Sequence, residues 1–257
     1  MTLPGSLTVT VDGPIAVLTL TRAAKRNALD DATVRGLEAF FADLPAGVRV
    51  VVLDAEGDHF CAGLDLGELG ERDTFAGIEH SRMWHRAFGL IEHGPVPVIS
   101  VLKGAVVGGG LELAAATHLR VAEESTFVAL PEGLRGLFVG GGASVRVPRL
   151  IGVARMTDLM LTGRRYDAAE AHAVGLAQYL VPDGAGLKTA LDLAARVAEV
   201  PPQTVFAVLQ VLPRIAQAGE YEAYLLEALT AAVAQGTDDA KQRMRAFLDG
   251  RAAKVER

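Results

Sequence analysis

The sequence contains a single cysteine, Cys61, among 257 residues, which excludes an internal disulfide framework. So little cysteine fits a reducing compartment. The chain also lacks any run of 18 or more apolar residues, so no transmembrane helix is expected. Its first residues, MTLPGSLTVTVDG, have neither the basic segment nor the apolar segment of a signal peptide. These absences predict a cytoplasmic protein without a membrane partner.

Positive charge is in deficit, because 25 Lys and Arg residues stand against 31 Asp and Glu, for a formal net charge of -6. Such a balance argues against nucleic acid as the main partner. The six histidines show no metal-ligand spacing. His80 and His85, for example, lie five positions apart and do not share a helix face. The histidine spacing therefore predicts no metal site.

Half of the residues are hydrophobic and 28 are glycine, and strand patterns alternate with helix patterns, as is typical of an α/β enzyme. The composition shifts near Asp183. Residues 1–185 are therefore predicted to form a β/α core, and residues 186–257 a helical region. Strands are expected at 7–11, 15–21, 48–53, 96–102, 119–122, 126–129 and 178–181. Helices are expected at 30–44, 74–91, 111–117, 144–151, 153–161, 167–173, 187–200, 202–218, 220–235 and 238–249.

The stretch Lys103–Ala116, KGAVVGGGLELAAA, joins the expected strand 96–102 to a helix. Three glycines, Gly108–Gly110, stand at this junction, where the absence of Cβ lets another group approach the backbone. The first N–H groups of a helix lack partners within the helix and its dipole makes that end positive, so the junction can hold a negative oxygen. Glu112 follows in the first turn. An anion site beside a carboxylate indicates acid–base chemistry on a carbonyl compound.

Three further segments accompany this stretch, at Arg22–Leu29 (RAAKRNAL), Phe60–Leu66 (FCAGLDL) and Leu130–Ser144 (LPEGLRGLFVGGGAS). In this order and at these separations, the four segments resemble the enoyl-CoA hydratase/isomerase family, also called the crotonase family. The resemblance extends over nearly the whole chain. It implies a spiral of repeated ββα units, then a C-terminal helical trimerisation region, and hence a homotrimer or hexamer.

The resemblance also implies a reaction, the addition of water to a trans-2-enoyl-CoA in fatty acid metabolism, which gives a 3-hydroxyacyl-CoA. By position, the backbone N–H groups of Leu64 and Gly109 match the donors that bind the thioester oxygen. Such donors contribute roughly 3–4 kcal/mol each in comparable oxyanion holes. Glu112 and Glu132 match the two acids of the hydratases. The resemblance assigns water activation to Glu112 and proton delivery at C2 to Glu132. An oxyanion site and two acids suffice for this reaction, so neither a metal nor a redox cofactor is expected.

A second set of positions matches family residues that line the coenzyme A and acyl groups. They are Lys25, Arg26, Ala28, Ala62, Asp65, Leu66, Gly108 and Gly140. Lys25 and Arg26 are the expected phosphate partners. Asp65 also fits the cap of a short helix, and Cys61 is interpreted as a packing residue because no base lies near it in the sequence. Trp84 is expected in the core or in the wall of the acyl pocket.

Departures from the family pattern leave the substrate open. Leu64 is bulkier than the alanine of simple hydratases. Arg135 stands in a usually apolar segment, where it would lower the pKa of a glutamate or meet a polar acyl chain. One alternative is a double-bond isomerase, in which Glu132 shuttles the proton and Glu112 is not required. Others are a hydratase or hydrolase of an aromatic, terpenoid or steroid CoA ester, and a non-catalytic CoA-binding or RNA-binding relative, against which the two acids and the acidic pI argue.

Overall fold

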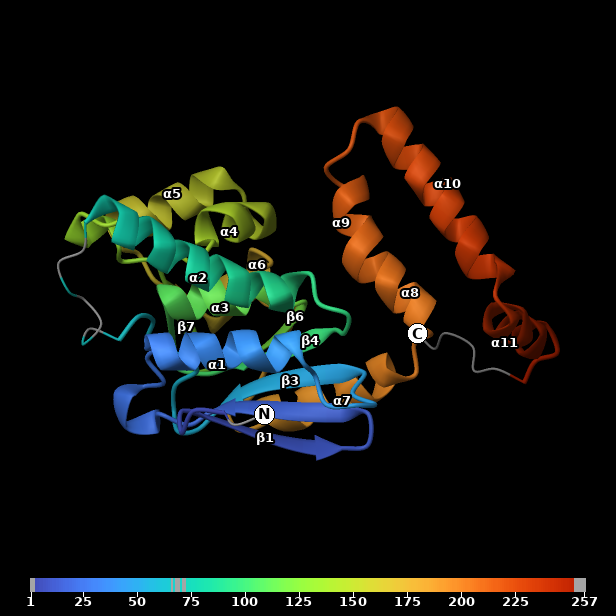
Figure 1. Ribbon diagram of the computed structural model, residues 1–257, viewed down its shortest axis with the longest axis horizontal. Coiled ribbons are helices and arrows are strands. Elements are labelled where there is room, and N and C mark those ends of the chain that lie inside the picture. Colours follow the sequence, from blue (N-terminus) through green and yellow to red (C-terminus); the bar gives the residue numbers. More distant parts are fainter. Residues whose placement is uncertain (1–2, 66, 68–69, 71–72, 252–257) are drawn as a thin grey trace. The chain divides into compact units, whose positions relative to one another are not determined.

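The computed structural model describes residues 3–65, 67, 70 and 73–251. The chain forms two compact units, Met1–Ala198 and Glu199–Arg257. The first unit holds all the strands of the described residues, and the second is helical (Figure 1). This agrees with the α/β class and the helical C-terminal region predicted from the sequence.

A six-stranded sheet forms the centre of the first unit, in the order β1-β2-β3-β4-β6-β9. Its first two strands form the expected antiparallel hairpin, and the remaining neighbours pair in parallel. Gly13 at the hairpin turn has a φ of 53°, a value that glycine adopts without strain. The strands are β1 (Leu7–Asp12), β2 (Ile15–Leu20), β3 (Val50–Ala55), β4 (Val98–Leu102), β6 (Leu119–Glu123) and β9 (Tyr179–Val181).

A second sheet of three short strands carries the chain toward the glycine triplet. Its order is β5-β7-β8, from β5 (Ala105–Val107), β7 (Phe127–Ala129) and β8 (Tyr166–Asp167). Strand β5 follows β4 almost directly and ends at Val107. Helix α3 (Gly109–Ala116) then begins after a single intervening residue, Gly108. The sequence pattern did not separate β5 or β8 from their surroundings, because both are too short to show a period.

Helices cover both faces of the six-stranded sheet. Because side chains alternate along a strand, Val51 and Leu53 of β3 face one core, and Val50 and Val52 face the other. The first core includes the buried faces of α1 (Asp31–Ala42) and α2 (Thr74–Glu92), which lie on the same side of the sheet in Figure 1. The remaining helices of this unit are α4 (Ala143–Ile151), α5 (Val153–Thr162), α6 (Ala168–Ala173) and α7 (Gly186–Ala198), with short 3-10 turns η1 (Ala23–Lys25) and η3 (Gly133–Arg135).

Helix α7 belongs to the first unit and not to the C-terminal helical region. Its Ala190, Leu193 and Ala194 pack on Ile99 and the other inward residues of the second core. The division between the two units therefore follows Ala198, one helix later than the expected boundary at residue 185. The composition shift marks the start of helical sequence. Which sheet face a helix covers depends on packing that the shift does not reveal.

The described part of the second unit, residues 199–251, contains five helical segments and little buried surface. They are α8 (Pro202–Phe206), the π-helical η4 (Ala207–Val211), α9 (Leu212–Ile215), α10 (Glu220–Gly236) and α11 (Asp238–Leu248). The first three follow one another over the expected helix 202–218. Pro213 lacks an N–H group, so the regular hydrogen-bond pattern cannot continue through it. Leu209 is the one buried hydrophobic residue of the described part of this unit. No described helix is both long and apolar enough to cross a membrane.

A buried guanidinium closes the C-terminal end of α3. Arg120 is 3% exposed, and it donates to the carbonyl oxygens of Ala114, Thr117 and Leu176 at 3.4, 2.5 and 2.5 Å. Burial lowers the pKa of Arg120 to about 10. A positive charge at this end of a helix interacts favourably with the helix dipole. Arg120 therefore holds α3, whose other end carries the glycine triplet, against β6.

We expect Arg120→Met to lower the free energy of unfolding by about 2–4 kcal/mol, because three buried carbonyls lose a charged donor. Thermal and urea unfolding followed by circular dichroism measure this loss. Arg82→Met is the matched control, since Arg82 is two-thirds exposed and its one ion pair among the described residues is with Glu79. Equal unfolding midpoints for the two variants would contradict the role given to Arg120.

Candidate active site

A short extended segment, Cys61–Leu64, lies between β5 and the loop before α1. On one side Cys61 N–H donates to Ala105 O at 2.9 Å, and Val107 N–H donates to Cys61 O at 3.1 Å. On the other side Leu29 N–H donates to Gly63 O at 2.8 Å, and Asp65 N–H donates to Leu29 O at 2.8 Å. Both contacts are parallel bridges. The N–H of Leu64 takes part in neither bridge, so it is available to another acceptor.

The first residue of α3 presents a second available N–H group beside that of Leu64. Gly108 N–H donates to Ala129 O at 2.9 Å, whereas Gly109 is the first helical residue and has no acceptor within the helix. A Cβ added to Gly109 would lie 3.4 Å from Leu64 N, and one added to Gly63 would lie 3.2 Å from Gly109 N. The two donors predicted from the sequence are therefore neighbours, although 45 positions separate them.

Each glycine of the triplet is required for a different reason. Gly108 has φ 53° and ψ -121°, and its Cβ would lie 2.5 Å from Glu132 Oε1. A Cβ on Gly109 would lie 2.7 Å from Cζ3 of Trp84, and one on Gly110 would lie 2.2 Å from the carbonyl oxygen of Cys61. Only glycine allows this backbone conformation and these approaches.

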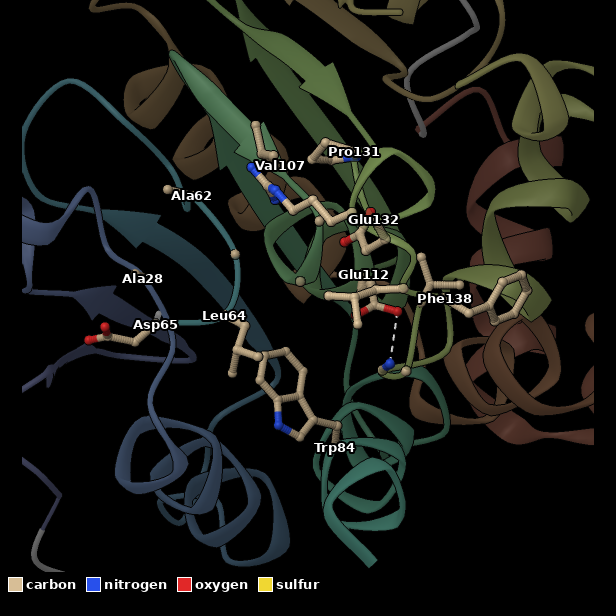
Figure 2. A pocket seen from close by; sticks show the side chains of 18 of the residues that line it. Ala28, Ala62, Leu64, Asp65, Trp84, Val107, Glu112, Pro131, Glu132 and Phe138 are labelled. Atoms are coloured by element: carbon tan, nitrogen blue, oxygen red, sulfur yellow. Dashed lines mark hydrogen bonds between the residues drawn. The ribbon is translucent and has the colours of Figure 1, made fainter. Parts of the chain in front are cut away.

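The carboxylate of Glu112 is buried and held at one oxygen. Glu112 is 4% exposed, and its Oε1 accepts a hydrogen bond from Gly141 N–H at 2.8 Å (dashed in Figure 2). The same oxygen accepts a second hydrogen bond from Ala143 N–H at 3.1 Å. Burial raises the pKa of Glu112 above its ordinary value, and the charge of Glu132 adds to the rise. The two N–H donors and Arg146 act in the opposite direction. Oxygen Oε2 is left free to face a ligand.

Glu132 directly precedes the turn η3 and lies in the same part of the cavity as Glu112 (Figure 2). Its Oε2 is buried and has no hydrogen-bond partner among the described residues. Burial raises the pKa of Glu132, while its own backbone N–H and the guanidinium of Arg135 lower it. An unpaired carboxyl oxygen of this kind can carry a proton to a ligand or remove one from it.

One cavity of about 600 Å³ brings together the predicted site residues. Glu112, Glu132, Leu64 and Gly109 line it, and so do the residues expected to contact coenzyme A: Lys25, Arg26, Ala28, Ala62, Asp65, Gly108 and Gly140. Leu66 lies outside the described residues. The roles of all these residues in binding and catalysis stay predictions.

Three residues left open by the sequence now have defined surroundings. Trp84 lies in the cavity wall, with one edge of its ring close to both Gly109 and Gly141. Asp65 accepts from Gly67 N–H at 3.0 Å, pairs with Arg22 at 2.5 Å and also lines the cavity. The thiol of Cys61 is fully buried, and burial raises its pKa to about 12, which agrees with a packing residue.

Sequence reasoning missed the backbone donors that hold Glu112, and also His80, Ser81 and Phe138 in the cavity wall. Gly141 follows directly after Gly140 in the second glycine cluster. The sequence therefore showed this cluster, but it did not show that the backbone of the cluster binds Glu112. His80 and Ser81 lie on α2 near Trp84, and the shared helix was the only signal. His80 Nε2 lies 2.8 Å from Asp31 Oδ1.

Comparison with known proteins points to one family. A model of the family described as enoyl-CoA hydratase/isomerase matches residues 10–257. The enoyl-CoA hydratase EchA19 of Mycobacterium tuberculosis is 32% identical over 245 residues, which are 93% of this chain and 92% of that protein. The fatty acid oxidation complex subunit alpha of Shewanella loihica is 41% identical over 163 residues, which are 61% of this chain and 23% of that protein.

Solved structures are similar over most of the chain. A protein of Rhodopseudomonas palustris, provisionally named an enoyl-CoA hydratase, is 54% identical with a TM-score of 0.94, over 99% of this chain and 100% of that chain. A Thermobifida fusca protein, also provisionally named an enoyl-CoA hydratase and solved with acetoacetyl-CoA, is 26% identical with a TM-score of 0.81, over 89% of this chain and 94% of that chain. The crotonase-like fold expected from the sequence is confirmed.

We expect Glu112 to titrate above the ordinary range of a glutamate, mainly because burial disfavours its charged form. An NMR titration of glutamate labelled with 13C at the carboxyl carbon measures this pKa, with Glu112→Gln to assign the signal. Glu132→Gln removes a nearby negative charge and lowers the pKa of Glu112, whereas Glu79→Gln on the exposed face of α2 leaves it unchanged. An ordinary glutamate pKa for this signal in the unmodified protein contradicts the expectation.

Proposed function

Because the chain belongs to the enoyl-CoA hydratase/isomerase family, we propose that it adds water reversibly to a trans-2-enoyl-CoA and forms the 3-hydroxyacyl-CoA. One observation carries this proposal. Two carboxyl groups, Glu112 and Glu132, line the same cavity as two neighbouring backbone donors. Hydration needs both kinds of group, since water must lose a proton while charge develops on the thioester oxygen.

The thioester oxygen is proposed to lie between the N–H groups of Leu64 and Gly109. Attack of water at C3 moves an electron pair through C2 and C1 onto this oxygen, which becomes an enolate. Both donors are fixed, one by the bridges on either side of Leu64 and the other by the start of α3. Donors already in place need no reorganisation when the charge appears, and each contributes roughly 3–4 kcal/mol to transition-state stabilisation.

Glu112 is proposed to accept the proton of water through Oε2, because Oε1 already accepts two backbone hydrogen bonds. As the enolate collapses, C2 takes a proton from Glu132, whose raised pKa keeps that proton available. The net change is one water added across the double bond. Proton exchange with solvent returns both carboxyl groups to their starting states. These steps need no metal and no redox cofactor.

Coenzyme A is proposed to bind beside Lys25 and Arg26, two of the cationic residues that line the cavity. Lys25 and Arg26 lie in the loop that precedes α1 and line the cavity with Ala28 and Ala62. A guanidinium and an ammonium suit the phosphate groups of the coenzyme. The binding of acetoacetyl-CoA by the related Thermobifida fusca protein supports a CoA ester as the ligand.

We expect the purified protein to hydrate crotonyl-CoA or a longer enoyl-CoA, followed by the loss of enoyl absorbance. Glu112→Gln and Glu132→Gln should each lower kcat about 10²- to 10⁴-fold, because each removes one proton-transfer group. Both variants should still bind acetoacetyl-CoA, and Glu79→Gln is the matched control.

The substrate range of the unmodified protein separates the proposal from its alternatives. A series from crotonyl-CoA to long-chain enoyl-CoAs, together with an aromatic enoyl-CoA, tests hydration. If the protein hydrates no member of the series, the hydratase proposal is wrong. Conversion of a 3-enoyl-CoA to its 2-enoyl isomer without hydration, with full activity in Glu112→Gln, identifies an isomerase in which Glu132 alone transfers the proton.

We further propose that the chain assembles into a homotrimer or a hexamer and acts in the cytoplasm. Support for assembly comes from the second unit, where large apolar side chains are exposed. They are Phe206, Val208, Leu212, Tyr221, Tyr224, Leu225, Leu226, Leu229, Val233, Met244, Phe247 and Leu248. An apolar surface of this extent on one helical unit is typical of an interface between subunits.

Light scattering coupled to size exclusion should give a particle of three or six chains of 27.0 kDa. Leu229→Glu with Val233→Glu places charge on exposed apolar positions of α10 and should shift the particle toward a single chain. Glu227→Lys on the same helix is the control for a change of charge alone. If the unmodified protein is a monomer, the proposed assembly is wrong. That result would not decide whether the protein is a hydratase, which the activity assay tests.

A further inference from the structure

The turn that holds Glu112 is itself held from behind by a buried arginine. Arg146 of α4 is 8% exposed, and its Nη1 donates to the carbonyl oxygen of Gly141 at 3.0 Å. The same peptide segment, Gly141–Ala143, donates both hydrogen bonds to Glu112 Oε1. Gly141 is thus bonded on both sides, through its N–H to Glu112 and through its carbonyl to Arg146.

A carboxylate at the end of α2 fixes the other side of the guanidinium. Arg146 Nε donates to Glu92 Oε2 at 2.7 Å, and both side chains are largely buried. Glu92 is the last residue of α2, the helix that also carries Trp84. A chain of contacts therefore runs from Glu92 through Arg146 and Gly141 to Glu112.

The backbone of the turn is shaped to receive the guanidinium. Gly142 has a φ of 108°, and a Cβ at this position would lie 2.2 Å from Arg146 Nη1. On the cavity side, a Cβ on Gly141 would lie 2.6 Å from Glu112 Oε2 and 2.9 Å from Cε3 of Trp84. The turn is packed tightly between Arg146 and Glu112, so a shift of one displaces the other.

We propose that Arg146 is a positioning residue for Glu112, anchored by Glu92, and that it keeps the Gly141–Ala143 turn aligned so that Glu112 presents Oε2 to the reacting water. The catalytic part of this inference rests on the proposed hydratase function. The hydrogen bonds of Arg146 go to Gly141 and Glu92, and not to the carboxylate of Glu112. Its effect passes through the turn and through its charge.

Arg146 acts on Glu112 in two ways, and they have different signatures. Geometrically, loss of the bond to Gly141 O frees the turn, and small displacements at a reacting group reduce rates by as much as about 100-fold. Electrostatically, the positive charge of Arg146 favours the ionised form of Glu112. Removing that charge raises the pKa of Glu112, so the form that accepts a proton from water is lost at a higher pH.

Other charged groups lie near Glu112 and Arg146, and they also influence how kcat depends on pH. Glu132, directly before η3, raises the pKa of Glu112, and Arg135 of η3 lies near Glu132. Around Arg146, Arg149 of α4 lies 3.9 Å from Glu92 and His93 lies 3.6 Å from it.

Four variants test the inference: Arg146→Met, Arg146→Lys, Glu92→Gln and Arg149→Met. Arg146→Met should lower kcat about 10- to 100-fold with KM for the enoyl-CoA little changed, and should move the acid limb of the kcat profile to higher pH. Arg146→Lys keeps the positive charge, so its acid limb should stay near that of the unmodified protein. It lacks the planar guanidinium group that bonds to both Gly141 and Glu92, so kcat should recover only in part. Arg149→Met, which removes the other guanidinium near Glu92, should leave both kcat and the acid limb of the pH profile unchanged.

Glu92→Gln guards against a variant that merely fails to fold. Gln can still accept a hydrogen bond from Arg146, so this variant should fold and show a smaller fall in kcat than Arg146→Met. The inference is overturned if Arg146→Met folds with unchanged kcat and acid limb. If Arg146→Met does not fold, the other variants decide. The inference is then overturned if Arg146→Lys and Glu92→Gln both have the same kcat as Arg149→Met.

An NMR titration of Glu112 separates this inference from the proposed function. The pKa of Glu112 should rise in Arg146→Met and not in Arg149→Met, whether or not the protein hydrates an enoyl-CoA. If the unmodified protein hydrates no enoyl-CoA but the titration shifts as expected, the hydratase proposal fails while the link from Arg146 to Glu112 stands. An unshifted titration overturns the link.

Discussion

The candidate site depends on close backbone contact between two segments far apart in the sequence. Residues 61–64 lie against β5 on one side and Leu29 on the other, and the start of α3 packs directly on Cys61. These contacts bring the N–H of Leu64 beside that of Gly109. A side chain at Gly110 would meet the carbonyl oxygen of Cys61, and one at Gly63 would meet that of Val107, so the absence of Cβ at these positions permits the pair of donors. Arg120 secures the same helix at its other end.

Burial of two carboxyl groups works against the stability that the backbone contacts provide. Glu112 and Glu132 both have raised pKa values, since desolvation penalises their charged forms. Hydrogen bonds offset this desolvation cost to different extents in the two acids. Glu112 accepts two backbone hydrogen bonds from a turn backed by Arg146, whereas one oxygen of Glu132 has no partner among the described residues. This asymmetry supports a division of labour in which a fixed base activates water and a less constrained acid delivers a proton.

Much of the fold and most of the candidate site could be predicted from the sequence. Period-two and helical patterns located the hairpin and the longer helices, and the spacing of the glycine triplet from Glu112 located half of the site. The other half, Leu64 and Glu132, came from a family resemblance, because no local pattern links segments that meet only in space. Strands β5 and β8 were too short to show a period, and the placement of α7 on the sheet depends on tertiary packing. The link from Glu92 to Arg146 joins residues 54 positions apart, and an arginine on a helix gives no sign of its partner.

The central claim is that Leu64 and Gly109 together hold the thioester oxygen while Glu112 and Glu132 flank the acyl carbons. A crystal structure of the protein with acetoacetyl-CoA bound tests it most directly. The account predicts the thioester oxygen within about 2.7–3.1 Å of both backbone nitrogens, with C2 and C3 next to the two carboxyl groups. A thioester oxygen bound by neither nitrogen, or an acyl group outside the cavity that contains Glu112 and Glu132, would contradict it.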